Sequence, residues 1–145
     1  MTFVSFASGS SGNCYLLTEG RAAVLLDTGI SLRRIKTGLA RRALTPDDLS
    51  AVLITHEHSD HVAGLPMLLK YYKNVKVYAP QTVAHALERA AAGLEGRIVP
   101  IPVGESVALK NFTLTAFPTM HGYHPDTQFL FLINPDAVCA LDSRR

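Results

Sequence analysis

The sequence predicts a mixed α/β domain, and three observations lead to this prediction. Ala22 to Leu26 and Ala51 to Thr55 are continuous apolar runs of strand length, which are typical of strands covered on both faces. The segment between them has the composition of a helix that Ser31 can cap through its hydroxyl group. An arrangement of this kind should bury its strands under helices on at least one face of the sheet.

The first half of the chain begins with a predicted hairpin. Two alternating runs, Thr2 to Ala7 and Cys14 to Thr18, flank the turn-forming stretch Ser8 to Asn13. Glu19-Gly20 then turns the chain into the first buried strand. The elements expected before the second buried strand are a helix from Ser31 to about Ala43 and a short turn over 46–49 that Thr45 can cap.

After the second buried strand, helical and strand patterns alternate and then give way to strands alone. From Val62 the residues Leu65, Leu69 and Tyr72 recur at helical spacing, and Pro66 is tolerated only in the first turn of that helix. The further expected elements are a strand at 75–78, a helix opened by Pro80 and stopped by Gly93, and strands at 97–101, 106–109, 112–117, 128–133 and 137–141.

The composition is that of one domain spanning residues 1–145, with 48% hydrophobic and 18% charged residues. No apolar run approaches the roughly 20 residues of a membrane-spanning helix, and the first residues lack the cationic start of a secretion signal. A cytoplasmic location is therefore expected. The formal net charge of +2 neither establishes nor excludes a nucleic-acid partner. The locally clustered basic residues are Arg33, Arg34, Lys36, Arg41 and Arg42.

The segment His56-Glu57-His58-Ser59-Asp60-His61 carries four metal-competent side chains directly after a buried strand. His56 and His58 are two residues apart in an extended segment, so their side chains can point the same way and hold one ion. Asp60 and His61 follow as the chain turns toward a helix, and they can converge on a second position. Imidazole and carboxylate ligands suit zinc, and also manganese or iron. The alternative is an exposed polar loop in which Asp60 only caps the next helix.

Two further candidates could complete this site from the far end of the chain. His121 follows the predicted strand at 112–117, and Asp142 ends the strand that begins at Ala137. Strand ends at one edge of a sheet gather into a shared site, so both residues can reach the histidine-rich segment. Spacing alone does not separate His121 from His124 as the ligand, and Asp142 could instead be a solvent-exposed aspartate.

Two features nearer the amino terminus could support the site. Asp27, directly after the first buried strand, could orient a histidine ligand by hydrogen bonding, or it could begin a turn with Thr28-Gly29. The loop from Ser8 to Asn13 offers hydroxyls and clustered backbone N–H groups that could hold a substrate phosphate, although it lacks the lysine of a P-loop. A tight structural turn is the other interpretation of this loop. The candidate phosphate contacts are Ser8, Ser10, Ser11 and Asn13.

The segment His56 to His61 resembles the His-x-His-x-Asp-His hallmark of the metallo-β-lactamase superfamily. This resemblance extends over almost the whole chain. The segments Ala7 to Asn13, Leu26 to Ile30 and Thr55 to Leu65 look like the bacterial subgroup called YycJ or WalJ. The six-residue run is highly specific for the superfamily, and the Ser-Gly-rich opening is moderately specific for the subgroup.

The resemblance implies an αββα sandwich with a dinuclear site at one edge, of which this chain would hold the first half and part of the second. By the same resemblance, His56, His58 and His121 would hold the first of two zinc ions, Asp60 and His61 the second, and Asp142 would bridge them. Asp60 is also our candidate catalytic residue. A metal-bridged hydroxide would then attack a phosphoryl or carbonyl centre. Since the subgroup resembles nucleases, the implied activity is that of a metal-dependent exonuclease acting on DNA or another phosphodiester.

Two departures from the family pattern leave other hypotheses open. The bridging aspartate lies in Leu141-Asp142-Ser143-Arg144 rather than in a Thr-Asp-Thr-Gly-like turn, and the chain ends before the segment that supplies the family's last histidine. We therefore expect a chain that is shortened at its C-terminus. A second hypothesis is an inactive or mononuclear metal-binding fragment that associates with itself as a homo-oligomer. A third is a hydrolase of esters, thioesters or lactams from the same superfamily.

Overall fold

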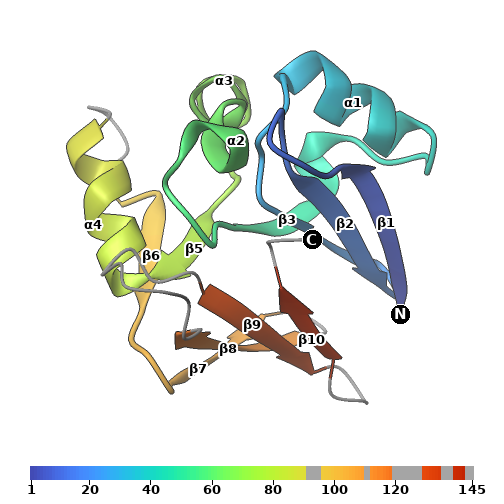
Figure 1. Cartoon of the computed structure of the whole chain (residues 1–145). Coiled ribbons are helices and arrows are strands. Elements are labelled where there is room, and N and C mark those ends of the chain that lie inside the picture. The colour runs from blue at the N-terminus through green and yellow to red at the C-terminus, as the bar shows by residue number, and fades with distance from the viewer. Residues whose placement is uncertain (91–95, 110–111, 119–128, 135–138, 143–145) are drawn as a thin grey trace.

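The computed structural model describes residues 1–90, 96–109, 112–118, 129–134 and 139–142. In these residues two sheets lie against each other, and helices cover the outer face of the larger sheet (Figure 1). The elements in chain order are β1 (Thr2–Ala7), β2 (Cys14–Glu19), β3 (Ala22–Leu26), α1 (Leu32–Ala40), η1 (Pro46–Asp48), β4 (Leu49–Leu53), α2 (Ser59–Val62), α3 (Leu65–Tyr71), β5 (Val77–Pro80), α4 (Gln81–Ala90), β6 (Ile98–Ile101), β7 (Ser106–Leu109), β8 (Phe112–Pro118), β9 (Phe129–Asn134) and β10 (Cys139–Asp142).

The larger sheet has six strands in the order β1-β2-β3-β4-β5-β6. Strands β1, β2 and β3 pair antiparallel, whereas β3 to β6 pair in parallel. Parallel neighbours need a crossover connection, which the intervening helices provide. The two continuous apolar runs form β3 and β4, which are central neighbours in register with Leu26 opposite Leu53.

Strand β3 is buried on both faces, as its apolar sequence predicts. Leu25 packs on the helical side, in a cluster that includes Ile35 of α1 and Leu69 of α3. Val24 packs on the opposite side, in a cluster that includes Leu114 of β8. Because successive side chains alternate across the sheet, this one strand stabilises both interfaces of the domain.

The second sheet is antiparallel, with the strand order β10-β9-β8-β7. The helices, the six-stranded sheet and the four-stranded sheet make three successive layers (Figure 1). The predicted α/β sandwich is confirmed for these three layers. Within the described ranges, no helix covers the outer face of the four-stranded sheet (Figure 1). No helix of the described chain is both long enough and apolar enough to span a membrane.

The first helix is shorter than predicted. It begins after the expected cap, because the hydroxyl of Ser31 accepts a hydrogen bond from the N–H of Arg34 at 3.2 Å. It ends at Ala40 rather than Ala43. Ala43 has a φ of 58°, in the left-handed region that closes many helices. The prediction missed this end because alanine is a strong helix former and gives no local stop signal.

Two other boundaries also differ from the prediction. The helix expected from Val62 is divided, because the single turn α2 ends there and α3 begins separately at Leu65. Pro66 does lie in the first turn of α3, as expected. Pro80 does not open a helix, since it is the last residue of β5 and pairs with Ile101 of β6. Helix α4 begins one residue later.

Candidate metal centre

The histidine-rich segment, residues 56–61, lies just beyond the end of β4 and is called the metal run below. The strand ends at Leu53, two residues before the predicted end. The N–H of Ile54 still donates to Tyr78 at 3.0 Å, so the backbone stays beside β5. Within the run, His56 and His61 are buried and His58 is exposed. The ring centre of His56 lies 4.0 Å from that of His58 and 5.2 Å from that of His61, so the three imidazoles are grouped.

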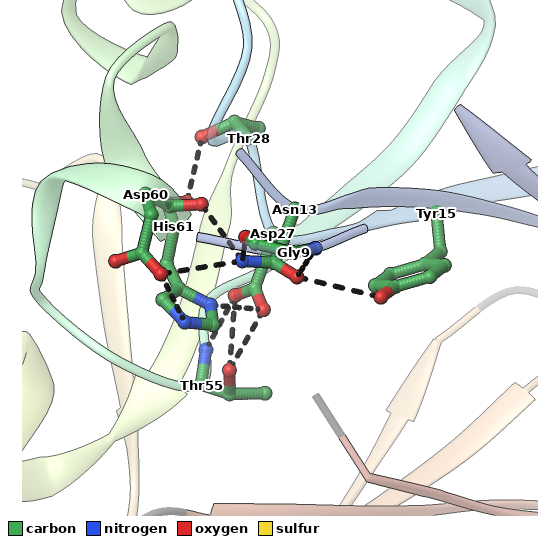
Figure 2. Close-up of polar contacts among 8 residues, drawn as sticks. All are labelled: Gly9, Asn13, Tyr15, Asp27, Thr28, Thr55, Asp60 and His61. Carbon is green, nitrogen blue, oxygen red and sulfur yellow. Dashed lines mark hydrogen bonds and ion pairs between the residues drawn. The ribbon is translucent and has the colours of Figure 1, made fainter. Parts of the chain in front are cut away.

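Asp27 holds the ring of His61 from the end of β3 (Figure 2). Its Oδ2 lies 2.8 Å from Nδ1 of His61. The same carboxylate accepts hydrogen bonds from the N–H of Thr55 at 2.9 Å and from its hydroxyl at 2.8 Å. Asp27 has a φ of 61°, which is uncommon for a residue other than glycine and is typically maintained at functional sites. The predicted contact between Asp27 and a histidine is therefore present.

The pKa shifts of these groups follow from burial and from this contact. Burial raises the pKa of the Asp27 carboxyl, and the bonds that it accepts from His61 and Thr55 oppose the shift. Burial acts to lower the pKa of His61, but the hydrogen bond and the charge of Asp27 outweigh it and raise that pKa. Burial, and then the neighbouring His58, lower the pKa of His56. A lowered pKa favours the neutral form of His56, which is the form of imidazole that binds metal ions.

Three segments far apart in the sequence are joined here by backbone hydrogen bonds. The N–H of Asn13 donates to the carbonyl of Asp60 at 2.7 Å, and the N–H of Gly29 donates to the carbonyl of Asn13 at 2.8 Å. The N–H of Thr28 donates to the carbonyl of His61, also at 2.8 Å. The Ser-Gly-rich loop, the turn after β3 and the metal run therefore hold one another in place.

Two glycines allow these segments to approach so closely. A Cβ atom on Gly29 would overlap the carbonyl of Asp60, and one on Gly64 would overlap the carbonyl of Ile30. In both cases the obstructing atom belongs to the backbone and cannot rotate away. Gly29 and Gly64 are therefore fixed by close packing rather than by an unusual φ.

The Ser-Gly-rich loop is organised around the side chain of Asn13, which is buried. Its Oδ1 accepts from the N–H of Gly9 at 3.1 Å, and its amide donates to the carbonyl of Gly9 at 2.9 Å and to that of Asp60 at 3.2 Å (Figure 2). The amide of Asn13 is thus engaged inside the protein. The loop serines are exposed, and contact with a substrate phosphate stays a prediction for Ser8, Ser10, Ser11 and Asn13.

One buried nitrogen without a hydrogen-bond partner indicates that these side chains fit a divalent metal ion. Nε2 of His56 is buried and has no hydrogen-bond partner in the described part of the chain. Buried polar atoms normally have a partner, and a metal ion is a frequent one for imidazole. Among the residues that the structure describes, no three His, Cys, Asp or Glu side chains already surround a common ion position. The predicted ligand His121 and its alternative His124 lie outside those residues, and so does the side chain of Asp142, whose backbone ends β10.

The sequence prediction missed several residues that shape this centre. It assigned no role to Thr55, which supplies two of the donors to Asp27. It also did not anticipate that Asn13 would connect the loop to Asp60. An asparagine after a Gly/Ser-rich turn is a known local signal, because its side chain readily bonds nearby backbone groups. The contact with Asp60, 47 residues away, has no such local signal.

The comparisons with known proteins agree with this fold. The model of the metallo-beta-lactamase superfamily matches residues 7–140. The solved structure titled MIM-2 metallo-beta-lactamase superposes with a TM-score of 0.73 at 22% sequence identity, covering 97% of this chain and 56% of that one. At this level of identity the superposition shows a shared fold.

Three of the curated relatives each match more than half of the chain. Exodeoxyribonuclease WalJ of Streptococcus pneumoniae is 42% identical over 84 residues, which are 58% of this chain and 31% of that protein. Exodeoxyribonuclease YycJ of Bacillus anthracis is 36% identical over 86 residues, covering 59% and 32%. Hydroxyacylglutathione hydrolase of Pectobacterium carotovorum is 34% identical over 82 residues, covering 57% and 28%. The matched segment spans about a third of the length of these relatives.

Proposed function

Because the chain belongs to the metallo-beta-lactamase superfamily, whose members bind divalent metal ions, we propose that this protein is a metal-dependent hydrolase of phosphodiester bonds in DNA. The observation that carries the choice of substrate is the degree of similarity. The relative named as an exodeoxyribonuclease is 42% identical, whereas the relative named as a hydroxyacylglutathione hydrolase is 34% identical over a segment of similar length. The Ser-Gly-rich loop beside the metal run also suits a phosphate group.

The proposed ligands divide into two groups. His56, His58 and His121 would hold one zinc ion, Asp60 and His61 would hold a second, and Asp142 would be a further ligand. When bound, such ions lower the pKa of coordinated water and stabilise the negative charge that develops on the attacked phosphorus centre. Asp60 is also our proposed catalytic residue, and its Oδ2 lies 3.5 Å from Nε2 of the proposed ligand His61.

Hydrogen bonds within the chain hold the proposed ligands in position. Asp27 occupies Nδ1 of His61, so Nε2, which lies 3.5 Å from Oδ2 of Asp60, is the ring nitrogen available to a metal ion. The carbonyls of Asp60 and His61 are tied to the segments on either side. A ligand whose other ring nitrogen is held by a carboxylate binds metal more tightly and in a fixed orientation.

The test is metal-dependent cleavage of end-labelled single- and double-stranded DNA, with Zn²⁺, Mn²⁺ or Fe²⁺ added to metal-free protein. We expect nucleotides to be released from the strand ends with at least one of these ions. A hydroxyacylglutathione thioester serves as the competing substrate. If DNA stays intact with every ion while the thioester is hydrolysed, the proposal is wrong and the protein is a thioesterase of the same superfamily.

Metal stoichiometry and oligomeric state address the remaining hypothesis. Elemental analysis and light scattering of the same preparation give the number of ions per chain and the mass in solution. Two ions per chain with turnover of DNA support the proposed enzyme. One ion per chain, a stable oligomer and no turnover of any substrate instead support a mononuclear fragment that associates with itself.

A further inference from the structure

A second feature lies on the far side of the turn that follows β3. A groove of about 900 Å³ runs between the edge strand β1 and helix α1. Its apolar residues are Val4, Phe6 and Ile30. Its charged residues, which define what we call the arginine groove, are Arg33, Arg34, Arg41 and Arg42. In Figure 1, α1 lies along the side of the domain formed by β1 and β2.

The positive charge of this groove is not balanced by nearby acids. No aspartate or glutamate lines the groove, and α1 itself contains none. Within the described ranges, none of the four arginines has an ion-pair partner. Arg33 and Arg34 also lie in the first turn of α1, where the helix dipole disfavours cations. The groove therefore presents positive charge that an anionic ligand would balance.

The turn after β3 connects the groove to the metal run. Ile30 and Ser31 of this turn line the groove, and the preceding Gly29 is packed against Asp60. A polymer bound in the groove therefore reaches the turn that is packed against the metal run.

The spacing of the arginines suits a polymer rather than a single small anion. One pair precedes the other by eight residues, which is about 12 Å along a helix axis. Phosphates follow one another at roughly 3.4 Å of axial rise in a stacked strand, so the two pairs span on the order of four nucleotides. A positively charged groove with an aromatic residue is also the common form of a single-strand site.

We propose that the arginine groove binds the phosphodiester backbone of a single DNA strand and directs its end toward the metal run. This inference rests on the proposed nuclease function, because it supplies the path of that enzyme's substrate. The two arginine pairs contact successive phosphates, and Val4, Phe6 and Ile30 provide the apolar floor. The groove adds affinity for DNA of any base sequence, since contacts with phosphates carry no sequence information.

The test compares two charge-matched variants of the full chain. The first replaces all four groove arginines with glutamine, and the second makes the same change at Lys36, Lys73, Lys76 and Arg89, which are exposed and do not line the groove. Each set removes four cations and lowers the formal net charge from +2 to −2. Lys36 lies on α1 itself, so the control also samples the same helix.

Binding of a fluorescein-labelled single-stranded DNA oligonucleotide is measured by anisotropy over a range of salt concentrations. For the groove variant we expect at least about a tenfold loss of affinity and a salt slope that is smaller by about 3, which corresponds to four lost phosphate contacts. For the control variant we expect a clearly smaller change in both quantities. Equal losses in the two variants would overturn the groove, because they would show a response to net charge alone.

Two further measurements keep the outcomes separate. Thermal unfolding shows whether the groove variant is folded. If that variant does not fold, a double variant with Arg41→Gln and Arg42→Gln, at the two residues beyond the end of α1, replaces it. Its matched control carries Lys73→Gln and Lys76→Gln. Metal-dependent cleavage of DNA by the unmodified protein tests the nuclease function independently. Loss of binding in the groove variant alone, without cleavage by the unmodified protein, would contradict the nuclease and leave a DNA-binding groove. Cleavage of DNA by the unmodified protein, together with equal DNA binding by the groove and control variants, would support the nuclease and contradict the groove.

Discussion

The metal run and the arginine groove lie on opposite sides of the turn at Gly29 to Ser31, and they are built in opposite ways. Around the metal run, polar groups are buried and bonded, and Asp27 alone accepts from Thr55 and His61. In the groove, four cations lie beside an open volume of about 900 Å³ without acids to balance them. The first region fixes the positions of its side chains through contacts within the chain. The second provides charge for a partner, so changes in the two regions should have separable effects.

The largest effect is expected from removing proposed ligands. His56→Ala and His61→Ala should each weaken the binding of Zn²⁺ or Mn²⁺ by at least about 100-fold. Mutation of a residue that only hydrogen-bonds to a ligand already lowers metal affinity by about 10- to 100-fold. Isothermal titration calorimetry on metal-free protein measures this change. His85→Ala is the matched control, because His85 is exposed on α4. Unchanged metal affinity in both ligand variants would show that the metal run is not the binding site.

A smaller effect in the same region is expected from Asp27→Asn. This change keeps the shape of the side chain but removes the charge and one of the acceptors used by Thr55 and His61. We expect metal affinity to fall by about 10- to 100-fold because His61 is no longer held in one orientation.

The readouts for Asp27→Asn separate positioning from folding. The imidazole signals of His61 in an NMR spectrum should shift in the metal-free protein. Asp47→Asn, at an exposed position of η1, should change neither these signals nor the affinity. A variant that is less stable but binds metal with unchanged affinity would show that Asp27 serves the fold alone.

The next effect compares one glycine from each region. A Cβ on Gly29 would meet the backbone of Asp60, whereas one on Gly38 would lie 2.7 Å from the ring of Phe6, which is a side chain. Gly29→Ala should therefore lower the free energy of unfolding by about 1–3 kcal/mol, as overpacking usually does. In Gly38→Ala the gain in helix propensity, about 1 kcal/mol, offsets part of the strain. Urea denaturation measures the free energy of unfolding of both variants. An equal decrease in Gly29→Ala and Gly38→Ala would mean that the two regions are equally rigid.

The sequence predicted the elements of the fold well where the signal was local. The apolar runs identified β3 and β4, the alternating runs identified β1 and β2, and the metal run was placed at the end of a buried strand. Such patterns depend only on neighbouring residues. The early end of α1 was missed because it depends on the left-handed conformation of Ala43.

Within the candidate site, the residue types were predictable and their mutual contacts were largely not. Asp27 was expected to orient a histidine, but its bonds to Thr55 were not foreseen. The approach of Gly29 to Asp60 depends on how three distant segments pack, and no spacing rule describes that packing. The cluster of arginines was visible in the sequence, whereas the groove that collects them required the position of α1 against β1.

The smallest effect lies at the junction of the two regions, at Ser31. Ser31→Ala removes the hydroxyl that accepts from the N–H of Arg34, and it should cost about 1 kcal/mol of the free energy of unfolding. Ser31→Asp keeps a cap and places a negative charge in the favourable field of a helix start that has no acid in its first turn, so stability should be restored. The same charge lies beside Arg33 and Arg34 and should weaken binding of single-stranded DNA more than Ser31→Ala does. If the more stable variant also binds DNA more tightly, binding follows the order of α1 rather than its charge, and the electrostatic basis of the groove is wrong.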